Sequence, residues 1–139
     1  MRAIRVLAAF AGLAFVAPIP ARADMLTVCA ADISQFCSDV GKGRGRISAC
    51  LAAEIDRLGS GCKAEVMRVM RGPVTPKEVR GALNPGFKVA LPQSCAASAK
   101  GLCPGVPAGD GRVLACLYAR ADRVPKPCVT AVRTALKNQ

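Results

Sequence analysis

The apolar positions after residue 24 follow helical spacing, at intervals of three and four residues. The first stripe is Leu26, Cys29, Ala30, Ile33, Phe36 and Cys37. The second stripe is Ile47, Cys50, Leu51, Ile55 and Leu58. A glycine-rich turn at residues 41–45 lies between them. This spacing predicts two helices with one apolar face each, joined by a short turn.

The same arrangement recurs in the second half of the chain. Its stripes are Cys95, Ala96, Ala99, Leu102 and Cys103, then Val113, Cys116, Leu117, Ala121 and Val124. A third helix is predicted after each pair, with Cys62, Val66, Val69 and Met70 on one face in the first copy and Cys128, Val132 and Leu136 in the second. The predicted fold class is all-α: two tandem helical hairpins held by disulfides, each followed by a short third helix.

The cysteine spacing shows that the two halves are a tandem duplication. The eight cysteines form two sets with the same intervals: Cys29, Cys37, Cys50 and Cys62, then Cys95, Cys103, Cys116 and Cys128. Adding 66 to each residue number of the first set gives the second, and nearly half of the residues from Cys29 to Cys62 are identical to their counterparts. The identities include Arg46/Arg112, Asp56/Asp122 and Arg57/Arg123. A fixed period of this kind is the mark of a repeat protein.

Helix geometry limits how these cysteines pair. Eight residues of helix rise ~12 Å and twelve rise ~18 Å, whereas a disulfide needs Cα atoms within ~7 Å. Pairs such as Cys29–Cys37 and Cys50–Cys62 are therefore excluded if the helices form. Antiparallel helices favour nested bridges, Cys37–Cys50 inside Cys29–Cys62 and Cys103–Cys116 inside Cys95–Cys128. Crossed pairing within each repeat is the alternative.

Residues 1–23 have the features of a cleaved secretory signal peptide. Arg2 and Arg5 precede the apolar run 6–17, and Ala21-Arg22-Ala23 fits the small-x-small cleavage rule. The apolar run spans only ~18 Å as a helix, which is too short for a membrane anchor. We therefore expect an exported protein, periplasmic or secreted, with no transmembrane segment in the mature chain. Such compartments allow disulfides to form.

The remaining chain divides into repeat 1 (24–71), a linker (72–90) and repeat 2 (91–139). The linker sequence Thr75-Pro76-Lys77-Glu78 predicts a short helix with a capping box, and Val74 and Val79 are spaced for a hydrophobic staple. A flexible linker is the alternative, because glycine and proline are frequent here.

The charge balance favours anionic partners. Of the 20 Lys and Arg residues, 17 follow residue 23, together with all nine acidic residues, so the mature net charge is +8. Such a charge attracts an acidic surface or ligand, although it also serves solubility alone. Nucleic acid is not expected as a partner, because the chain is exported and aromatic residues that stack on bases are scarce.

The residue types present argue against an enzyme, a metal site or a cofactor. The chain has no histidine and no C-x-x-C pair, so the usual general base and redox dithiol are missing. Structural zinc is the alternative for any cysteine cluster, but zinc sites use shorter spacings and often histidine. Met25, Met67 and Met70 are an alternative thioether set for copper, although such residues more often fill cores. We expect no catalytic residues, no metal and no cofactor.

The repeat resembles a known family. Cys29 to Cys37, Gly43-Arg44-Gly45-Arg46, Cys50-Leu51 and Leu58 before Cys62 resemble the cysteine-rich repeat of the Golgi apparatus protein family. That family is also described as cysteine-rich fibroblast growth factor receptor or E-selectin ligand, and short bacterial exported proteins with one or two repeats look closer still. The resemblance implies an exported, disulfide-bonded helical repeat that binds proteins or glycan-associated partners and has no catalytic residues.

The repeated arginines are the predicted contact surface. Arg46, Arg57, Arg112 and Arg123 occur at matching positions of the two copies. The predicted function is that of a non-catalytic protein-interaction or structural module of unknown partner. The alternative is a basic module that binds anionic ligands or envelope surfaces, through phosphate, lipid or polysaccharide groups. For the four arginines themselves, the alternative is that they end helices and form salt bridges.

Overall fold

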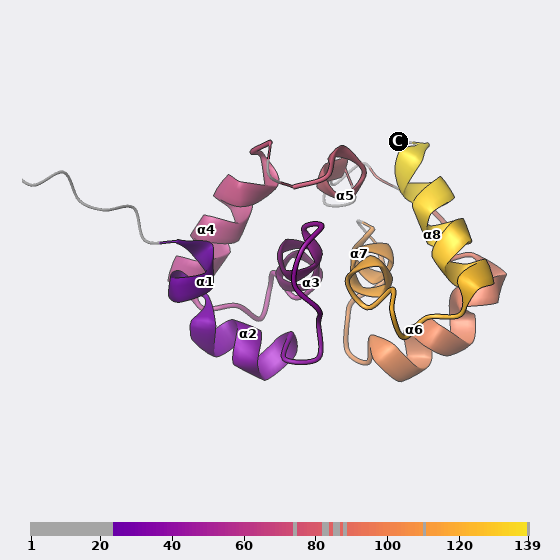
Figure 1. The fold of residues 1–139 in the computed structure, drawn as a ribbon, viewed down its shortest axis with the longest axis horizontal. Helices are drawn as coiled ribbons and strands as arrows, with labels where there is room; N and C mark the ends of the chain where they lie inside the picture. Colours follow the sequence, from indigo (N-terminus) through magenta and orange to yellow (C-terminus); the bar gives the residue numbers. More distant parts are fainter. Residues whose placement is uncertain are drawn as a thin grey trace, which may run out of the picture.

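The structure is a computed structural model that describes residues 24–138, except residues 74, 82, 83, 85, 86, 88 and 110. Within these residues every regular element is a helix (Figure 1). Repeat 1 contains α1 (Met25–Val28), α2 (Ala30–Phe36), α3 (Arg46–Ala53) and α4 (Ser60–Met70). The linker contains α5 (Lys77–Gly81). Repeat 2 contains the 3-10 helix η1 (Gln93–Cys95), α6 (Ala96–Leu102), α7 (Arg112–Ala119) and α8 (Lys126–Lys137). The all-α prediction is confirmed.

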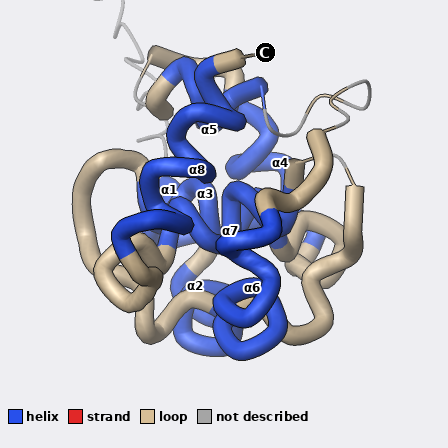
Figure 2. Tube along the Cα trace, turned by 90° about the vertical axis from the view of Figure 1, so that its right-hand side faces the viewer, coloured by secondary structure: helices blue, strands red, loops and turns tan. Residues whose placement is uncertain are grey.

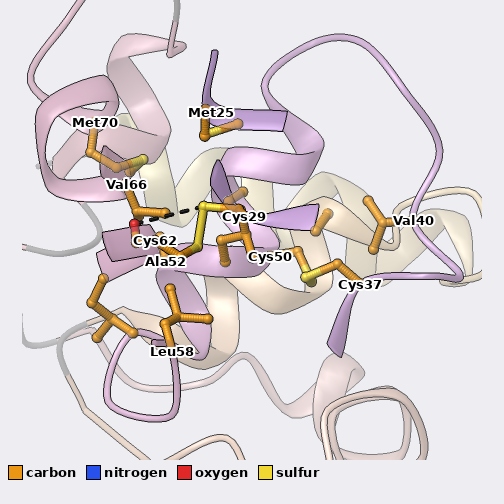
Figure 3. Close-up of a cluster of buried hydrophobic side chains, with 14 of the residues drawn as sticks. Met25, Cys29, Cys37, Val40, Cys50, Ala52, Leu58, Cys62, Val66 and Met70 are labelled. Atoms are coloured by element: carbon orange, nitrogen blue, oxygen red, sulfur yellow. Dashed lines mark hydrogen bonds between the residues drawn. A yellow bond between two sulfur atoms is a disulfide. The ribbon is translucent and has the colours of Figure 1, made fainter. Parts of the chain in front are cut away.

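Four disulfides join the helices in the nested arrangement. The outer bridges Cys29–Cys62 and Cys95–Cys128 have Cα separations of 4.8 and 4.9 Å. The inner bridges Cys37–Cys50 and Cys103–Cys116 have Cα separations of 6.0 and 6.2 Å. The outer bridge of repeat 1 lies in the middle of its apolar core, between Met25, Val66 and Leu58 (Figure 3).

The two repeats meet along α3 and α7, which lie side by side in the centre of the molecule (Figures 1 and 2). The contact is reciprocal. Ala53 at the end of α3 is buried in the core of repeat 2, and its counterpart Ala119 is buried in the core of repeat 1. Small side chains at these positions allow the helix axes to approach closely. The repeats are therefore related by an approximate two-fold axis between α3 and α7.

This contact explains why α3 is buried on all sides. The sequence predicts one apolar stripe, but every residue from Ser48 to Ile55 is buried. One side of α3 packs on α2 and α4 of its own repeat, and the other packs on α7. The residues of the predicted stripe are buried or partly buried as expected, and the alanines on the other side of α3 are buried as well because they pack against the second repeat.

The predicted first helix is interrupted at Cys29, where α1 ends and α2 begins. Met25 is buried in place of Leu26, whose side chain is 49% exposed, and Ala30 is also exposed. The inward face is spaced by four residues, through Met25, Cys29 and Ile33. The flexible Met25 side chain fills the space beside the outer disulfide (Figure 3).

The linker packs on both repeats. Val79 of α5 is fully buried in the core of repeat 1, and α5 also contacts α8 of repeat 2. Thr75 does not precede α5 directly; its hydroxyl donates a hydrogen bond of 3.2 Å to the carbonyl oxygen of Val69 at the end of α4. The predicted staple residue Val74 lies outside the described residues. Phe87 is buried in the core of repeat 2.

Gly45 is a position where a side chain does not fit. It precedes α3 in a left-handed conformation with φ of +67°, and an added Cβ would lie 2.5 Å from Cδ of Pro76. Gly43 has φ of +89°, but nothing lies within 4 Å of its added Cβ. Both glycine-to-alanine changes incur left-handed strain of about 1–2 kcal/mol.

We therefore expect Gly45→Ala to be less stable than Gly43→Ala by a further ~1–3 kcal/mol, the usual range for overpacking. Urea unfolding of the two variants measures this difference. Equal stabilities would contradict a close contact between the linker and the α3 turn.

Candidate functional site

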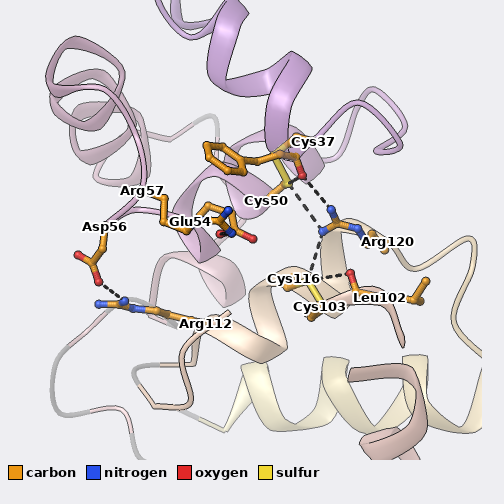
Figure 4. A network of polar contacts seen from close by, with 11 residues as sticks. Cys37, Cys50, Glu54, Asp56, Arg57, Leu102, Cys103, Arg112, Cys116 and Arg120 are labelled. Atoms are coloured by element: carbon orange, nitrogen blue, oxygen red, sulfur yellow. Dashed lines mark hydrogen bonds and ion pairs between the residues drawn. A yellow bond between two sulfur atoms is a disulfide. The ribbon is translucent and has the colours of Figure 1, made fainter. Parts of the chain in front are cut away.

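Two reciprocal ion pairs connect the repeats. Arg46 donates to Asp122 across the interface. Arg112 donates to Asp56 in the same way, and Figure 4 shows this second pair. The repeat relation converts one pair into the other, since Arg112 is the counterpart of Arg46 and Asp122 that of Asp56. The hydrogen bond and charge of Arg112, with the charge of Lys63, lower the pKa of Asp56 below its ordinary value. The carboxylates are largely exposed, so each pair adds little stability and mainly fixes how the repeats are oriented.

The other two predicted contact residues also make contacts inside the molecule. The Arg57 guanidinium lies 4.4 Å from the centroid of the Phe36 ring and 3.1 Å from the Glu54 carboxylate. Arg123 pairs with Asp39 of the other repeat. The structure thus places all four predicted arginines in intramolecular salt bridges, the arrangement that the alternative interpretation describes.

Arg120 is a buried charge at the centre of the interface. Its Nε donates to Asp39 at 3.0 Å, and its Nη2 donates to the carbonyl oxygen of Phe36 at 2.9 Å. Its Nη1 lies 3.8 Å from Sγ of Cys50 and 3.2 Å from Sγ of Cys116, so it contacts both inner disulfides (Figure 4).

The counterpart of Arg120 in repeat 1 is Glu54, so the symmetry is broken here. Partial burial raises the pKa of Asp39, but the hydrogen bond and charge of Arg120 and the charge of Arg123 outweigh this and lower it. A shallow cleft of about 380 Å³ beside these residues contains Asp39, Glu54 and three arginines. Its carboxylates are paired with its arginines, so most of its charge is already compensated.

A second hollow lies on another side of the interface, between the loop before α3, helix α7 and helix α8. It consists of two adjoining cavities of about 300 and 210 Å³, which share Arg44, Tyr118 and Arg133. We call it the basic groove and define it by Arg44, Arg46, Tyr118, Ala121, Asp122, Arg133, Leu136 and Lys137. It therefore carries four cations and one carboxylate.

Most of the groove's cations are not neutralised. The side chains of Arg44, Arg133 and Lys137 are exposed and make no ion pair or hydrogen bond within the described part of the chain. Arg46 is held by Asp122 and by the carbonyl oxygen of Lys42, and its buried Nε has no partner among the described residues. The groove thus presents an excess of hydrogen-bond donors.

Tyr118 fixes the loop that carries Arg44. Its hydroxyl donates a hydrogen bond of 2.9 Å to the carbonyl oxygen of Arg44. Arg44 has φ of +51°, in the left-handed region that non-glycine residues rarely adopt. Because the hydrogen bond joins repeat 2 to this strained residue of repeat 1, the groove exists only when the repeats are packed together.

The groove has no chemical equivalent on the opposite side of the two-fold axis. At the matching positions, Arg44 is replaced by Asp110, Tyr118 by Ala52 and Arg133 by Met67. The residues that match between the repeats hold the scaffold. The groove residues Tyr118, Arg133 and Lys137 were not predicted; the signal that identifies the first two is the difference between the copies.

The described residues contain neither a cluster of metal-ligating side chains nor a membrane-spanning helix. No group of three or more His, Cys, Asp or Glu side chains is placed to hold a metal ion in residues 24–138 outside the seven gaps. Met25 and Met70 are buried in the core of repeat 1, whereas Met67 is 43% exposed on α4. Among the helices described, none is long and apolar enough to cross a bilayer.

The cationic side chains of the basic groove are groups that can bind an anion. Guanidinium and ammonium groups donate hydrogen bonds, accept none and remain charged at neutral pH. They can hold and orient an anion from several sides of the groove.

The chain matches no family model, no curated protein and no solved structure.

Proposed function

We propose that this protein is an exported, non-catalytic binding module and that its partner is anionic. The observation that carries this proposal is the unequal charge of two equivalent faces. The basic groove has four cations and one carboxylate, whereas the matching residues of the other face are two cations, Arg71 and Arg112, and two carboxylates, Asp56 and Asp110. Neither set of charged residues takes part in the disulfides that hold the helices together.

Export is supported by the cysteine chemistry. Four disulfides persist in an oxidising compartment and are rare in the cytosol. The predicted signal peptide, residues 1–23, lies outside the described residues. The resemblance to the Golgi apparatus protein repeat belongs to the same proposal, since it implies an exported binding module without catalytic residues. The partner is then an anionic component of the envelope or an acidic secreted molecule.

Binding of an uncharged protein surface is the second candidate. Three large apolar side chains are exposed on α1 and α4, which pack on each other: Leu26, Val28 and Met67. Exposed apolar residues can mark a protein-interaction surface when they form a patch. Such binding would depend little on salt, whereas binding of an anion weakens as salt screens the charges.

The test compares folded protein with an unfolded chain of equal charge. The protein spanning residues 24–139 is mixed with vesicles of phosphatidylcholine, vesicles that also contain phosphatidylglycerol, and polyglucuronate. We expect saturable binding to at least one anionic probe at ~0.15 M salt, weakening at higher salt. The control is the chain reduced and capped with iodoacetamide, which keeps its charge but not its disulfides.

Two outcomes would contradict the proposal. One is no binding to either anionic probe at low salt. The other is equal binding by the reduced, capped chain, because this would show that net charge alone is responsible and the folded module is not needed.

A further inference from the structure

We propose that the basic groove is a binding site for a phosphate monoester carried on a ring or another apolar body. This inference rests on the proposed function and specifies its site and ligand class. Three elements converge on the groove: the loop before α3 supplies Arg44 and Arg46, α7 supplies Tyr118, and α8 supplies Arg133 and Lys137.

The charge of the groove selects a dianion. Four cations face one carboxylate, Asp122, which is already engaged by Arg46. A carboxylate or phosphodiester brings a single negative charge and would leave most of the excess uncompensated. A phosphate monoester carries about −1.5 to −2 charges at neutral pH and three acceptor oxygens.

The donor geometry fits the same group. Three of the four cations are arginines, whose planar guanidinium presents paired donors that match the oxygen spacing of phosphate. Arg46 is held in place on two sides by Asp122 and the Lys42 carbonyl, so it is already oriented before a ligand arrives. Arg44 and Arg133 are free to turn towards an anion, because neither has a partner among the described residues.

The second cavity accounts for the rest of the ligand. It adjoins the first and is lined by Tyr118 and Leu136, together with Arg44, Arg133 and Lys137. A cavity of about 210 Å³ accommodates a ring-sized group. A phosphate held by the arginines would thus place its attached ring or chain against Tyr118. Such a ligand would occupy both cavities, whereas inorganic phosphate would occupy only the first.

The chain offers a direct reporter of this site. Tyr118 is its single tyrosine, and there is no tryptophan. Intrinsic fluorescence of the protein therefore reports the groove itself. We expect phenyl phosphate to change this fluorescence saturably, with inorganic phosphate binding more weakly and benzoate more weakly still. Because the second ionisation of a phosphate monoester has a pKa of about 6, its affinity should rise between pH 5 and 7.

The matched variants use the residues of the opposite face. Arg44→Asp with Arg133→Met converts two groove positions to the residues found at 110 and 67 and lowers the net charge by three, since two cations are removed and one carboxylate is added. Arg71→Asp with Lys100→Met removes the same charge from exposed positions outside the groove. We expect about a tenfold or greater loss of phenyl phosphate affinity in the first variant, since charge-assisted hydrogen bonds are lost. The second should retain wild-type affinity. Thermal melting checks that both remain folded.

The outcomes separate this inference from the proposed function. Equal losses in the two variants, or benzoate binding as tightly as phenyl phosphate, would overturn the phosphate site. If neither phenyl phosphate nor phosphatidic acid binds through the groove while phosphatidylglycerol vesicles still bind, the phosphate site is wrong and the proposed function stands. Vesicles containing phosphatidic acid distinguish the source: groove-dependent binding to them without a response to phenyl phosphate supports a lipid phosphate.

Discussion

Replacing Arg120 with methionine is expected to lower the free energy of unfolding by about 2–4 kcal/mol. The side chain is only 8% exposed and supplies hydrogen bonds to Asp39 and to the Phe36 carbonyl oxygen. Methionine keeps much of the volume but removes the donors, so the Phe36 carbonyl oxygen loses its partner and the partly buried Asp39 carboxylate keeps only the exposed Arg123. Arg120→Glu, which introduces the residue found at position 54, should be more severe because it faces Asp39. Urea unfolding measures both.

Arg123→Met is the matched control. Arg123 pairs with the same carboxylate but its side chain is 52% exposed, so its loss should cost under about 1 kcal/mol. Equal effects of the two methionine variants would contradict a central role for Arg120.

Acid unfolding supplies an independent readout for Arg120. Because the pKa of Asp39 is lower in the folded protein, its contribution is complete above its unfolded pKa of about 3.9. That contribution is lost as the pH falls through the lower, folded value. Arg120→Met removes the main cause of this lowering, so the variant should lose less stability than the wild type between pH 4 and 2, roughly the interval in which Asp titrates.

Removal of the outer disulfide by Cys29→Ala with Cys62→Ala is expected to cost about 3–4 kcal/mol. The bridge closes a separation of 33 residues, and both sulfurs are buried in the core of repeat 1. Removal of the inner bridge Cys37–Cys50 should cost less, because its separation is 13 residues and the outer bridge already restricts that loop. Thermal and urea unfolding of the two double variants test this order.

The shape of the transition is part of the same prediction. Repeat 1 contributes Ala53 to the core of repeat 2 and receives Ala119 in return. Loss of one outer bridge should therefore destabilise both repeats together and give a single transition. Two separate transitions, with repeat 2 unchanged, would show that the repeats unfold independently.

Local spacing in the sequence predicted the helical regions of each repeat, but not the interruption of the first one at Cys29. The intervals between the cysteines limit the possible bridges, and residues such as Cys128, Val132 and Leu136 lie on the buried face of α8 as predicted. The packing of one repeat on the other left no such signal, because it depends on contacts between residues far apart in the chain. Arg46 and Asp122 show this: each resembles a solvated surface charge until the other repeat is in place.

The basic groove escaped prediction for a related reason. Arg44 belongs to repeat 1, whereas Tyr118 and Arg133 belong to repeat 2, so neither repeat contains the site. Residues that match between the copies are those that the scaffold requires twice. The pairs in which one copy differs, Arg44/Asp110, Tyr118/Ala52 and Arg133/Met67, mark the face that is unlike its counterpart.

The contact between the repeats is one contact made twice, since the repeat relation exchanges Arg46–Asp122 with Arg112–Asp56. A chain with a single repeat would hold both halves of that contact and would associate with its own copy. Such a homodimer must display every face in duplicate, because one gene specifies both subunits. Fusion of the two copies into one chain allows the matching faces to differ in sequence. Only in the fused chain can arginines accumulate on one face while the matching positions carry as many carboxylates as cations.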